Sequence, residues 1–200
     1  MCSTNTGSIP SDSLYKPVVG VVGGGQLAQM LAIAAANRGI DIIVQSPSIN
    51  DPAVSLASAH LLADSKNVEA TKALLDECTC ITFENEWIDI DGLEQIELES
   101  GFFTPSLKSI RPLIDKRSQR KLLTDLSIPC AEWLECKNLD LGMNSLPENW
   151  SFPVVAKASR GGYDGKGTRI ISDEDELAEF FQNVDSTNWF IEQWEPYEVE

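Results

Sequence analysis

The stretch from Pro153 to Thr168, with the sequence PVVAKASRGGYDGKGT, constrains the fold of this chain most. It begins with the short apolar run Val154–Ala156, continues into Lys157, and then carries four glycines within the seven residues 161–167. Apolar residues resume at positions 170 and 171. This order predicts a β-hairpin whose tip is too rich in glycine to hold one conformation unaided. Because bare backbone N–H groups can approach phosphate oxygens closely, the hairpin is a candidate phosphate-binding element.

Two lysines add positive charge to this hairpin. Lys157 ends an apolar strand, where an ammonium group is costly without an anionic partner. Lys166 lies within the tip and can reach a phosphate directly. The pattern is not a P-loop, since Thr168 follows Gly167 with no lysine between them. A surface hairpin with an ordinary flexible tip is the alternative interpretation.

The first half of the chain has the pattern of an open α/β sheet. An apolar run, Pro17–Val22, leads into Gly23–Gly25, an alanine-rich helical stretch at 26–36, and a second apolar run at 40–44. This order predicts the opening of a doubly wound parallel sheet. Three glycines at the N-terminus of a helix also form an anion site, although a purely structural tight turn is possible.

The spacing of the same glycines also bears on whether the chain binds a dinucleotide cofactor. Gly23, Gly25 and Ala28 fit the fingerprint G-x-G-x-x-[GA], which predicts NAD or FAD and an acidic residue at the end of the second strand. Gln45 and Ser46 stand there instead. A dinucleotide-dependent oxidoreductase is therefore disfavoured.

Charged residues follow two further elements. The run Cys80–Phe83 predicts a strand, and Glu84 comes directly after it, where open α/β sheets bind ligands. A helix N-capping charge is the alternative role for this carboxylate. Residues 106–126 predict a pair of helices with a basic cluster at Lys116, Arg117, Arg120 and Lys121, whose default interpretation is a solvated helix face.

The acidic run 173–176 predicts a helix start, because acids in the first turn suit the helix dipole. Ser172, directly before this run, is the predicted N-cap.

Composition excludes several classes of function. A formal net charge of −16 disfavours a nucleic-acid partner, which needs clustered lysine and arginine. Five cysteines without a C-x-x-C pair disfavour a zinc site or a disulfide framework and fit a reducing cytoplasm. No run approaches the roughly 20 apolar residues of a membrane span. Residues 1–14 are predicted to be a disordered lead-in.

The hairpin wording K-x-x-x-G-G-Y-D-G-K-G resembles the ATP-grasp enzymes, and among them the N5-carboxyaminoimidazole ribonucleotide synthase family. The resemblance continues in chain order through G-G-G-Q-L, F-E-N, D-K-x-x-x-R, S-I-P and the terminal glutamate segment. It implies an α/β fold, with a Rossmann-like pre-ATP-grasp domain at residues 15–105 and the first part of an α+β ATP-grasp domain at 106–200. The departures are Lys116, where the family more often has arginine, together with Ser127 and Cys130.

The resemblance also implies site residues. Those implied to bind ATP are Lys116, Lys157, Gly162, Tyr163, Asp164, Gly165, Lys166, Gly167, Thr168, Glu192, Gln193, Trp194, Glu195 and Glu200. Those implied to face the ribonucleotide are Gly24, Gly25, Gln26, Leu27 and Glu84. The residues implied to take part in catalysis are Tyr163, Asp164 and Lys166.

The implied reaction joins bicarbonate to 5-aminoimidazole ribonucleotide. Bicarbonate attacks the γ-phosphate of ATP to give carboxyphosphate, which carboxylates the amine and leaves ADP and phosphate. Mg²⁺ is the expected cofactor, and the full-length protein is expected to be a cytoplasmic homodimer. In this family the Mg²⁺ carboxylates and the groups that grip the substrate phosphate lie beyond the segment matched here. Residues 1–200 alone are therefore expected to bind nucleotide weakly and to show no turnover.

Two other functions remain open beside this one. Another ATP-grasp ligase, such as a formate-using glycinamide ribonucleotide transformylase, is disfavoured by Tyr163 and Asp164, since that relative carries small polar residues there. The second is a nucleotide-binding module without enzymatic activity.

Overall fold

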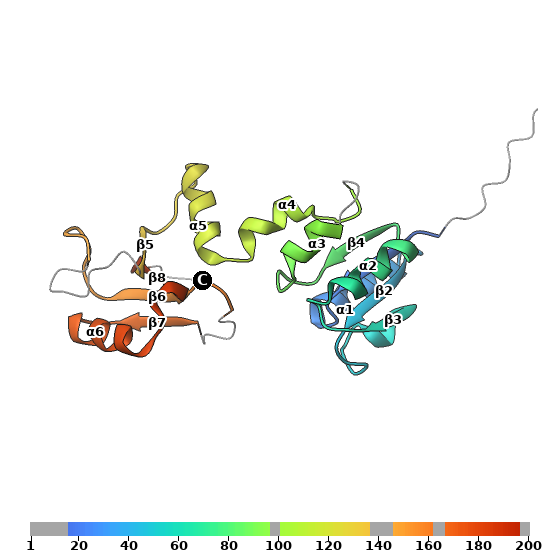
Figure 1. The fold of residues 1–200 in the computed structure, drawn as a ribbon, viewed down its shortest axis with the longest axis horizontal. Helices are drawn as coiled ribbons and strands as arrows, with labels where there is room; N and C mark the ends of the chain where they lie inside the picture. Colours follow the sequence, from blue (N-terminus) through green and yellow to red (C-terminus); the bar gives the residue numbers. More distant parts are fainter. Residues whose placement is uncertain (1–15, 97–100, 137–145, 162–166, 197–200) are drawn as a thin grey trace, which may run out of the picture. The chain divides into compact units, whose positions relative to one another are not determined.

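A computed structural model describes residues 16–96, 101–136, 146–161 and 167–196 of the chain (Figure 1). The chain forms two compact units, Met1–Leu107 and Lys108–Glu200. The boundary falls within the short helix α4 (Leu107–Ile110). Among the described residues, no helix is both long enough and apolar enough to cross a membrane.

The first unit is built on a four-stranded parallel sheet in the order β3-β2-β1-β4. Its strands are β1 (Val18–Val22), β2 (Asp41–Ser46), β3 (Ala59–Leu62) and β4 (Cys80–Phe83). Its helical segments are α1 (Gln26–Ala36), η1 (Val54–Leu56), α2 (Val68–Glu77) and α3 (Ile90–Ile96). The predicted Rossmann-like order is thus confirmed, whereas strand β3 was not predicted.

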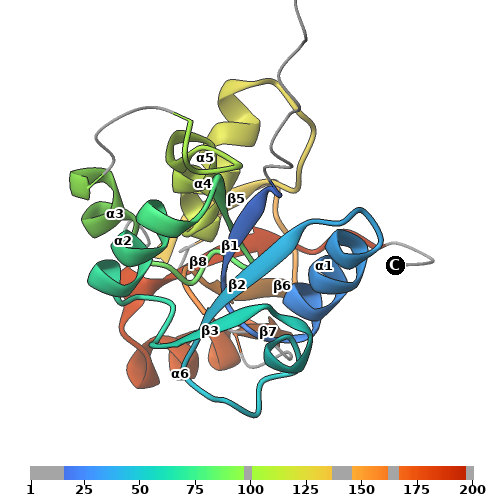
Figure 2. The ribbon, with the colours of Figure 1, turned by 90° about the vertical axis from the view of Figure 1, so that its right-hand side faces the viewer.

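Helices cover both faces of this sheet (Figure 2). On one face Ala28 and Ala32 of α1 pack in a cluster that also contains Val21. On the other face Gly20 lies close to α2, because a Cβ at this glycine would come 3.3 Å from a methyl of Leu74. Neighbouring residues of β1 therefore point to opposite helices, as the alternation of a strand requires.

Helix α1 turns its small side chains inward. Ala28 and Ala32 are buried against the sheet, whereas Leu27 and Met30 are 58% and 64% exposed. Two alanines four residues apart form a flat stripe on one side of the helix. The backbone of α1 can consequently lie close to strands β1 and β2.

The second unit is built on a four-stranded antiparallel sheet in the order β5-β8-β6-β7. Its strands are β5 (Trp133–Glu135), β6 (Val154–Ala158), β7 (Thr168–Ile171) and β8 (Trp189–Gln193). Its helical segments are η2 (Arg111–Leu113), α5 (Lys116–Asp125), α6 (Glu174–Asn183) and η4 (Ser186–Asn188). Strands β6 and β7 pair with Lys157 opposite Thr168, which confirms the predicted hairpin.

The two faces of this second sheet differ in chemistry. Val154 and Ala156 of β6 are fully buried in a cluster with Phe180 of α6. Lys157 belongs to the other face, because successive side chains of a strand alternate. Figure 1 shows α6 against one side of the sheet and α5 on the opposite side.

The predicted cap of α6 is wrong by one residue. Asp173, not Ser172, is the N-cap, and its carboxylate accepts a hydrogen bond of 2.8 Å from the Glu176 amide. The Glu176 carboxylate in turn accepts one of 2.9 Å from the Ser172 amide. Glu176 is the third residue after the cap, but its carboxylate bonds the amide of the residue before the cap and not that of Asp173 itself. The bond from the Glu176 amide to the Asp173 carboxylate thus identifies Asp173, and not Ser172, as the cap.

Candidate functional site

The hairpin lysine lies on the face of the second sheet that α6 does not cover. Lys157 is paired with Phe190 in the register of β6 and β8. Its Nζ forms an ion pair with Oε2 of Glu192, two residues further along β8. The anionic partner that the sequence demanded for this lysine is therefore a carboxylate of the same sheet.

Glu192 carries a second cation on its other oxygen. Arg120 of α5 donates from Nε to Oε1 of the carboxylate, while Lys157 contacts Oε2. The Glu192 side chain is only 4% exposed, and those of Arg120 and Lys157 are 22% and 28% exposed. One buried carboxylate thus joins two cations, which leaves this charged triad, Arg120–Glu192–Lys157, with a net positive charge.

Aromatic side chains adjoin the triad. Trp133 of β5 stands opposite Glu192 in the sheet register. Its ring meets that of Phe190 edge to face, with 6.0 Å between ring centroids. Low-polarity neighbours such as these strengthen electrostatic interactions, because little water is present to screen them.

Helix α5 places Lys116 next to the root of the hairpin. Lys116 is the first residue of α5, and its amide donates a 2.8 Å hydrogen bond to the carbonyl of Ser159. Asp115 caps the helix, accepting hydrogen bonds from the amides of Arg117 (2.9 Å) and Ser118 (3.2 Å). The backbone of Lys116 is thereby fixed to the residue that follows β6.

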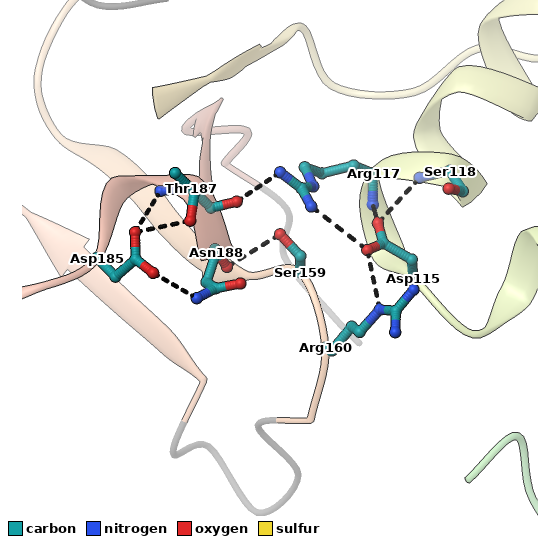
Figure 3. A network of polar contacts seen from close by, with 8 residues as sticks. All are labelled: Asp115, Arg117, Ser118, Ser159, Arg160, Asp185, Thr187 and Asn188. Atoms are coloured by element: carbon teal, nitrogen blue, oxygen red, sulfur yellow. Dashed lines mark hydrogen bonds and ion pairs between the residues drawn. The ribbon is translucent and has the colours of Figure 1, made fainter. Parts of the chain in front are cut away.

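The carboxylate of Asp115 also organises the arginines around it (Figure 3). Its Oδ2 lies 3.5 Å from Arg117 Nη2 and 3.3 Å from Arg160 Nε. Arg117 continues the network by donating from Nη1 to the carbonyl of Thr187, at 2.7 Å. The segment before β8 is thus tied to α5.

Further hydrogen bonds join the residue that follows β6 to the segment before β8 (Figure 3). The Ser159 hydroxyl and amide both donate to the carbonyl of Asn188, at 2.9 and 2.8 Å. Asp185 accepts hydrogen bonds from Thr187 and from the side chain of Asn188. The root of the glycine hairpin is therefore held on both sides.

The pKa of Asp115 lies below its ordinary value of 3.8. Burial alone would raise this pKa, but hydrogen bonds from the Ser118 amide and from Arg117, together with the charge of Arg117, outweigh it. Asp115 is therefore ionised at neutral pH and serves the arginines as an acceptor.

Several predicted ATP residues lie outside the described part of the chain. These are Gly162, Tyr163, Asp164, Gly165, Lys166 and Glu200. The predicted mobility of the tip, Gly161–Gly167, falls mostly on undescribed residues and remains a prediction. The described edges of the tip are in place: Gly167 is buried and its carbonyl accepts a 2.8 Å hydrogen bond from the Ala158 amide, whereas Thr168 is exposed.

The end of β8 leads into the predicted adenine-side segment. Gln193 is half-buried, and its amide donates to the carbonyl of Glu132 at 2.9 Å. Trp194, which follows, is 38% exposed, and Glu195 is exposed. Of the four residues 192–195, Glu192 alone is buried, so the segment passes from the sheet to the surface.

In the first unit, the glycine turn is occupied by a carboxylate of the chain itself. The Gly25 amide donates a 2.8 Å hydrogen bond to Oε2 of Glu84. Gly23 has φ +110°, and a Cβ there would lie 2.6 Å from the Cβ of Glu84. Glu84 thus places a negative charge at the N-terminus of α1, whereas the contact of this turn with the ribonucleotide stays a prediction. Gln26 and Leu27, which begin α1, are exposed.

Gln45 has a structural role that excludes ribose binding. Its side-chain nitrogen donates to the Asp64 carbonyl at 2.8 Å, and its oxygen accepts from the Thr71 hydroxyl at 2.8 Å. The residue is fully buried. Both ends of the amide are consequently used in joining β2 to α2 and to the loop before it, which agrees with the low expectation of a dinucleotide cofactor.

No group of three or more histidine, cysteine, aspartate or glutamate side chains suited to a metal ion occurs within the described ranges. The residues that would hold Mg²⁺ are therefore not assigned.

Three site residues were not predicted individually from the sequence: Arg120, Asp115 and Arg160. Arg120 was seen only as part of a basic cluster and of the motif D-K-x-x-x-R, with no role of its own. A signal for it exists, because it follows Lys116 by four residues and so lies on the same side of α5. Nothing in the local sequence indicates which carboxylate it meets 72 positions later in the chain.

Two domain families match the chain, one after the other. Residues 17–111 match the ribonucleotide synthetase preATP-grasp domain, and residues 121–200 match the ATP-grasp domain. The N5-carboxyaminoimidazole ribonucleotide synthase of Synechocystis sp. is 40% identical over 182 residues, which cover 91% of this chain and 45% of that protein.

Solved structures of the same kind are also similar. The carboxyaminoimidazole ribonucleotide synthase of Aspergillus clavatus complexed with ATP has a TM-score of 0.79 and 28% identity, over 92% of this chain and 48% of that chain. The Aspergillus clavatus N5-carboxyaminoimidazole synthase in complex with ADP and 5-aminoimidazole ribonucleotide has a TM-score of 0.78 and 26% identity, with the same coverage. The chain thus spans about half the length of the relatives it matches.

Proposed function

Because the chain belongs to the ATP-grasp proteins, with a ribonucleotide synthetase preATP-grasp domain followed by an ATP-grasp domain, we propose that it acts in the ATP-dependent carboxylation of 5-aminoimidazole ribonucleotide. The observation that carries the proposal is the hairpin with Lys157 at the end of its first strand, on a positively charged face of the sheet. ATP and bicarbonate are the other substrates in this proposal, and N5-carboxyaminoimidazole ribonucleotide, ADP and phosphate are the products.

The second unit takes ATP in this proposal. Lys157 and Lys116 bind its phosphates, and the glycine-rich segment 162–167 with Thr168 covers them. Backbone groups of residues 192–195 hold the adenine, and the carboxylates of Glu195 and Glu200 hold the ribose. The excess positive charge of the triad supports this assignment, since phosphate is favoured where cations exceed anions.

The first unit takes the ribonucleotide in this proposal. Gly24, Gly25, Gln26 and Leu27 line its site, and Glu84 accepts a hydrogen bond from it. Glu84 is suited to this role because Gly25 already fixes one of its oxygens. The Oε2 atom is thus held, and the remaining acceptor capacity of the carboxylate is available to a hydroxyl or amine of the substrate.

Within the tip, Tyr163, Asp164 and Lys166 take the catalytic roles. Asp164 orients the substrate amine, and the closed tip excludes water, which would destroy a labile acyl phosphate. Lys166 adds positive charge where negative charge builds up on the phosphoryl group. Mg²⁺ would supply the main neutralisation of the phosphate oxygens when bound.

The setting we propose is a cytoplasmic homodimer that binds neither nucleic acid nor membrane. The described cysteines support a reducing compartment, because Cys78, Cys80, Cys130 and Cys136 are all free thiols.

The experiment combines binding and turnover. Calorimetry should show that the chain prefers ATP to NAD⁺, and 5-aminoimidazole ribonucleotide to glycinamide ribonucleotide. ADP formation by the full-length protein should require both bicarbonate and 5-aminoimidazole ribonucleotide. Turnover with formate and glycinamide ribonucleotide instead would identify the transformylase alternative, and nucleotide binding that no ribonucleotide enhances would favour a binding module.

A further inference from the structure

We propose that Arg120 is a positioning residue that keeps Glu192 neutralised when Lys157 leaves this carboxylate for a phosphate of the nucleotide. The inference rests on the proposed function, since it takes ATP as the ligand of Lys157. It adds to that function a residue for which the family resemblance implied no role. It also describes what must happen to the ion pair when the ligand arrives.

The geometry already separates the two cations on the carboxylate. Arg120 contacts Oε1 of Glu192 and Lys157 contacts Oε2. Each oxygen therefore has its own partner, and removal of one leaves the other contact intact. The two cations also come from different elements, Arg120 from α5 and Lys157 from β6.

The chemistry of the two side chains indicates that the lysine, and not the arginine, leaves the carboxylate. An ammonium group on four rotatable carbons can reorient toward a new anion, whereas a guanidinium keeps its charge at all relevant pH values and holds a carboxylate in a fixed geometry. Arg120 additionally comes from the middle of a helix whose N-terminus is capped by Asp115. Its side chain is also the less exposed of the two, at 22% against 28% for Lys157.

Burial makes a second cation necessary. The Glu192 side chain is 4% exposed, so it cannot exchange a lost partner for water. A buried carboxylate without a partner is strongly disfavoured. If Lys157 were the only cation on Glu192, moving it to a nucleotide phosphate would leave a buried carboxylate without a partner, and the cost of that would weaken ATP binding. With Arg120 in place, Lys157 is balanced by phosphate and Glu192 by arginine.

The test is a thermodynamic cycle on the whole chain, with ATP affinity measured by calorimetry in the presence of Mg²⁺. The proteins are wild type, Arg120→Met, Glu192→Gln and the double variant. Arg120→Met should bind ATP roughly 10- to 100-fold more weakly, the range of a charge-assisted contact. In the Glu192→Gln background, where no carboxylate needs a partner, the same change should alter affinity by less than about twofold.

Two further variants separate positioning from structural support. Arg120→Lys keeps a cation on Glu192 and should restore most of the lost affinity. Arg169→Met removes an arginine from an exposed pair with Glu176 in the same unit and should leave ATP affinity unchanged. Equal losses for Arg120→Met in both Glu192 backgrounds would overturn the inference, because they would indicate only a weakened fold. An unchanged affinity in Arg120→Met would overturn it as well.

A measurement without nucleotide distinguishes this inference from the proposed function. Acylation of the Lys157 amine should be several-fold slower in Arg120→Met than in wild type, because the lysine alone then neutralises the carboxylate. An equal rate would overturn the sharing of Glu192. A wild-type chain that binds no ATP would refute the proposed function, whereas the acylation rates would still decide whether Arg120 and Lys157 share the carboxylate.

Discussion

Asp115 offers the most direct test of how α5 is joined to the hairpin root. The carboxylate does two separable things: it caps α5 through two backbone amides, and it pairs with Arg117 and Arg160. Asp115→Asn keeps an acceptor for the cap, since asparagine caps helices as well as aspartate does, but it removes the charge. Asp115→Ala removes both contributions.

The expected changes in the free energy of unfolding depend on how exposed the partners of Asp115 are. Loss of the cap costs about 1 kcal/mol, within a range of roughly 0.5–2. The Arg160 side chain is 71% exposed, so its pair with Asp115 contributes little, whereas that of Arg117 is 25% exposed. We assign about 1 kcal/mol to the loss of charge. Asp115→Asn should therefore lower the free energy of unfolding by about 1 kcal/mol, and Asp115→Ala by about 2 kcal/mol.

Tryptophan fluorescence during urea denaturation is a suitable assay, because most tryptophans lie in the second unit. They are Trp133, Trp150, Trp189 and Trp194, with Trp87 in the first unit. The pH dependence gives a second readout. Because the folded pKa of Asp115 is lowered below 3.8, its stabilisation is complete above that value and is lost as the pH falls through the folded pKa. The gap between wild type and Asp115→Asn should be constant above about pH 5 and should close in acid.

Asp173 provides the matched control. It caps α6 by accepting one backbone hydrogen bond, from the Glu176 amide, and no ion pair to it occurs in the described segments. Asp173→Asn should thus be close to neutral, and Asp173→Ala should cost about 1 kcal/mol. If Asp115→Asn were as neutral as Asp173→Asn, the arginine pairs would contribute nothing, and the account of the hairpin root would be refuted.

Three other outcomes are expected. Lys157→Ala should weaken ATP binding by roughly 1.5–3 kcal/mol with the fold retained, and unchanged affinity in calorimetry would exclude a phosphate role. Gly25→Ala should displace the Glu84 carboxylate, which a Cβ there would meet, and thereby weaken ribonucleotide binding; an unchanged ribonucleotide affinity in calorimetry would contradict this. Cys136, whose pKa burial raises to about 12, should resist thiol reagents at pH 8 while exposed Cys130 reacts, as mass spectrometry of the labelled chain can show.

The sequence was most informative where a pattern is local. Apolar runs interrupted by glycine predicted β1, α1 and the β6–β7 hairpin, because strand alternation and glycine turns depend on neighbouring residues only. Strand β3 was not predicted, since Ala59–Leu62 is four residues long, half exposed and lies at the edge of the sheet. Short edge strands carry little of the β-branched signal on which such predictions depend.

The candidate site was predictable only in part. The sequence indicates that Lys157 needs an anion, because a lysine at the end of an apolar strand is otherwise costly. It does not indicate that the anion is Glu192, 35 residues later, since the choice depends on the register of β6 against β8. Arg120 reaches the same carboxylate from a helix that precedes both strands. Ion pairs of this kind arise from tertiary packing, so the residues next to each partner in the sequence do not indicate them.

The alternation of β6 also bears on insertions and deletions. Adding or removing one residue between Val154 and Lys157 would reverse the direction of the lysine side chain, from the face with Glu192 to the apolar cluster against α6. A change of two residues would preserve its direction. The strand that carries the lysine should accordingly keep its length among proteins of this kind, or change it by two residues at a time.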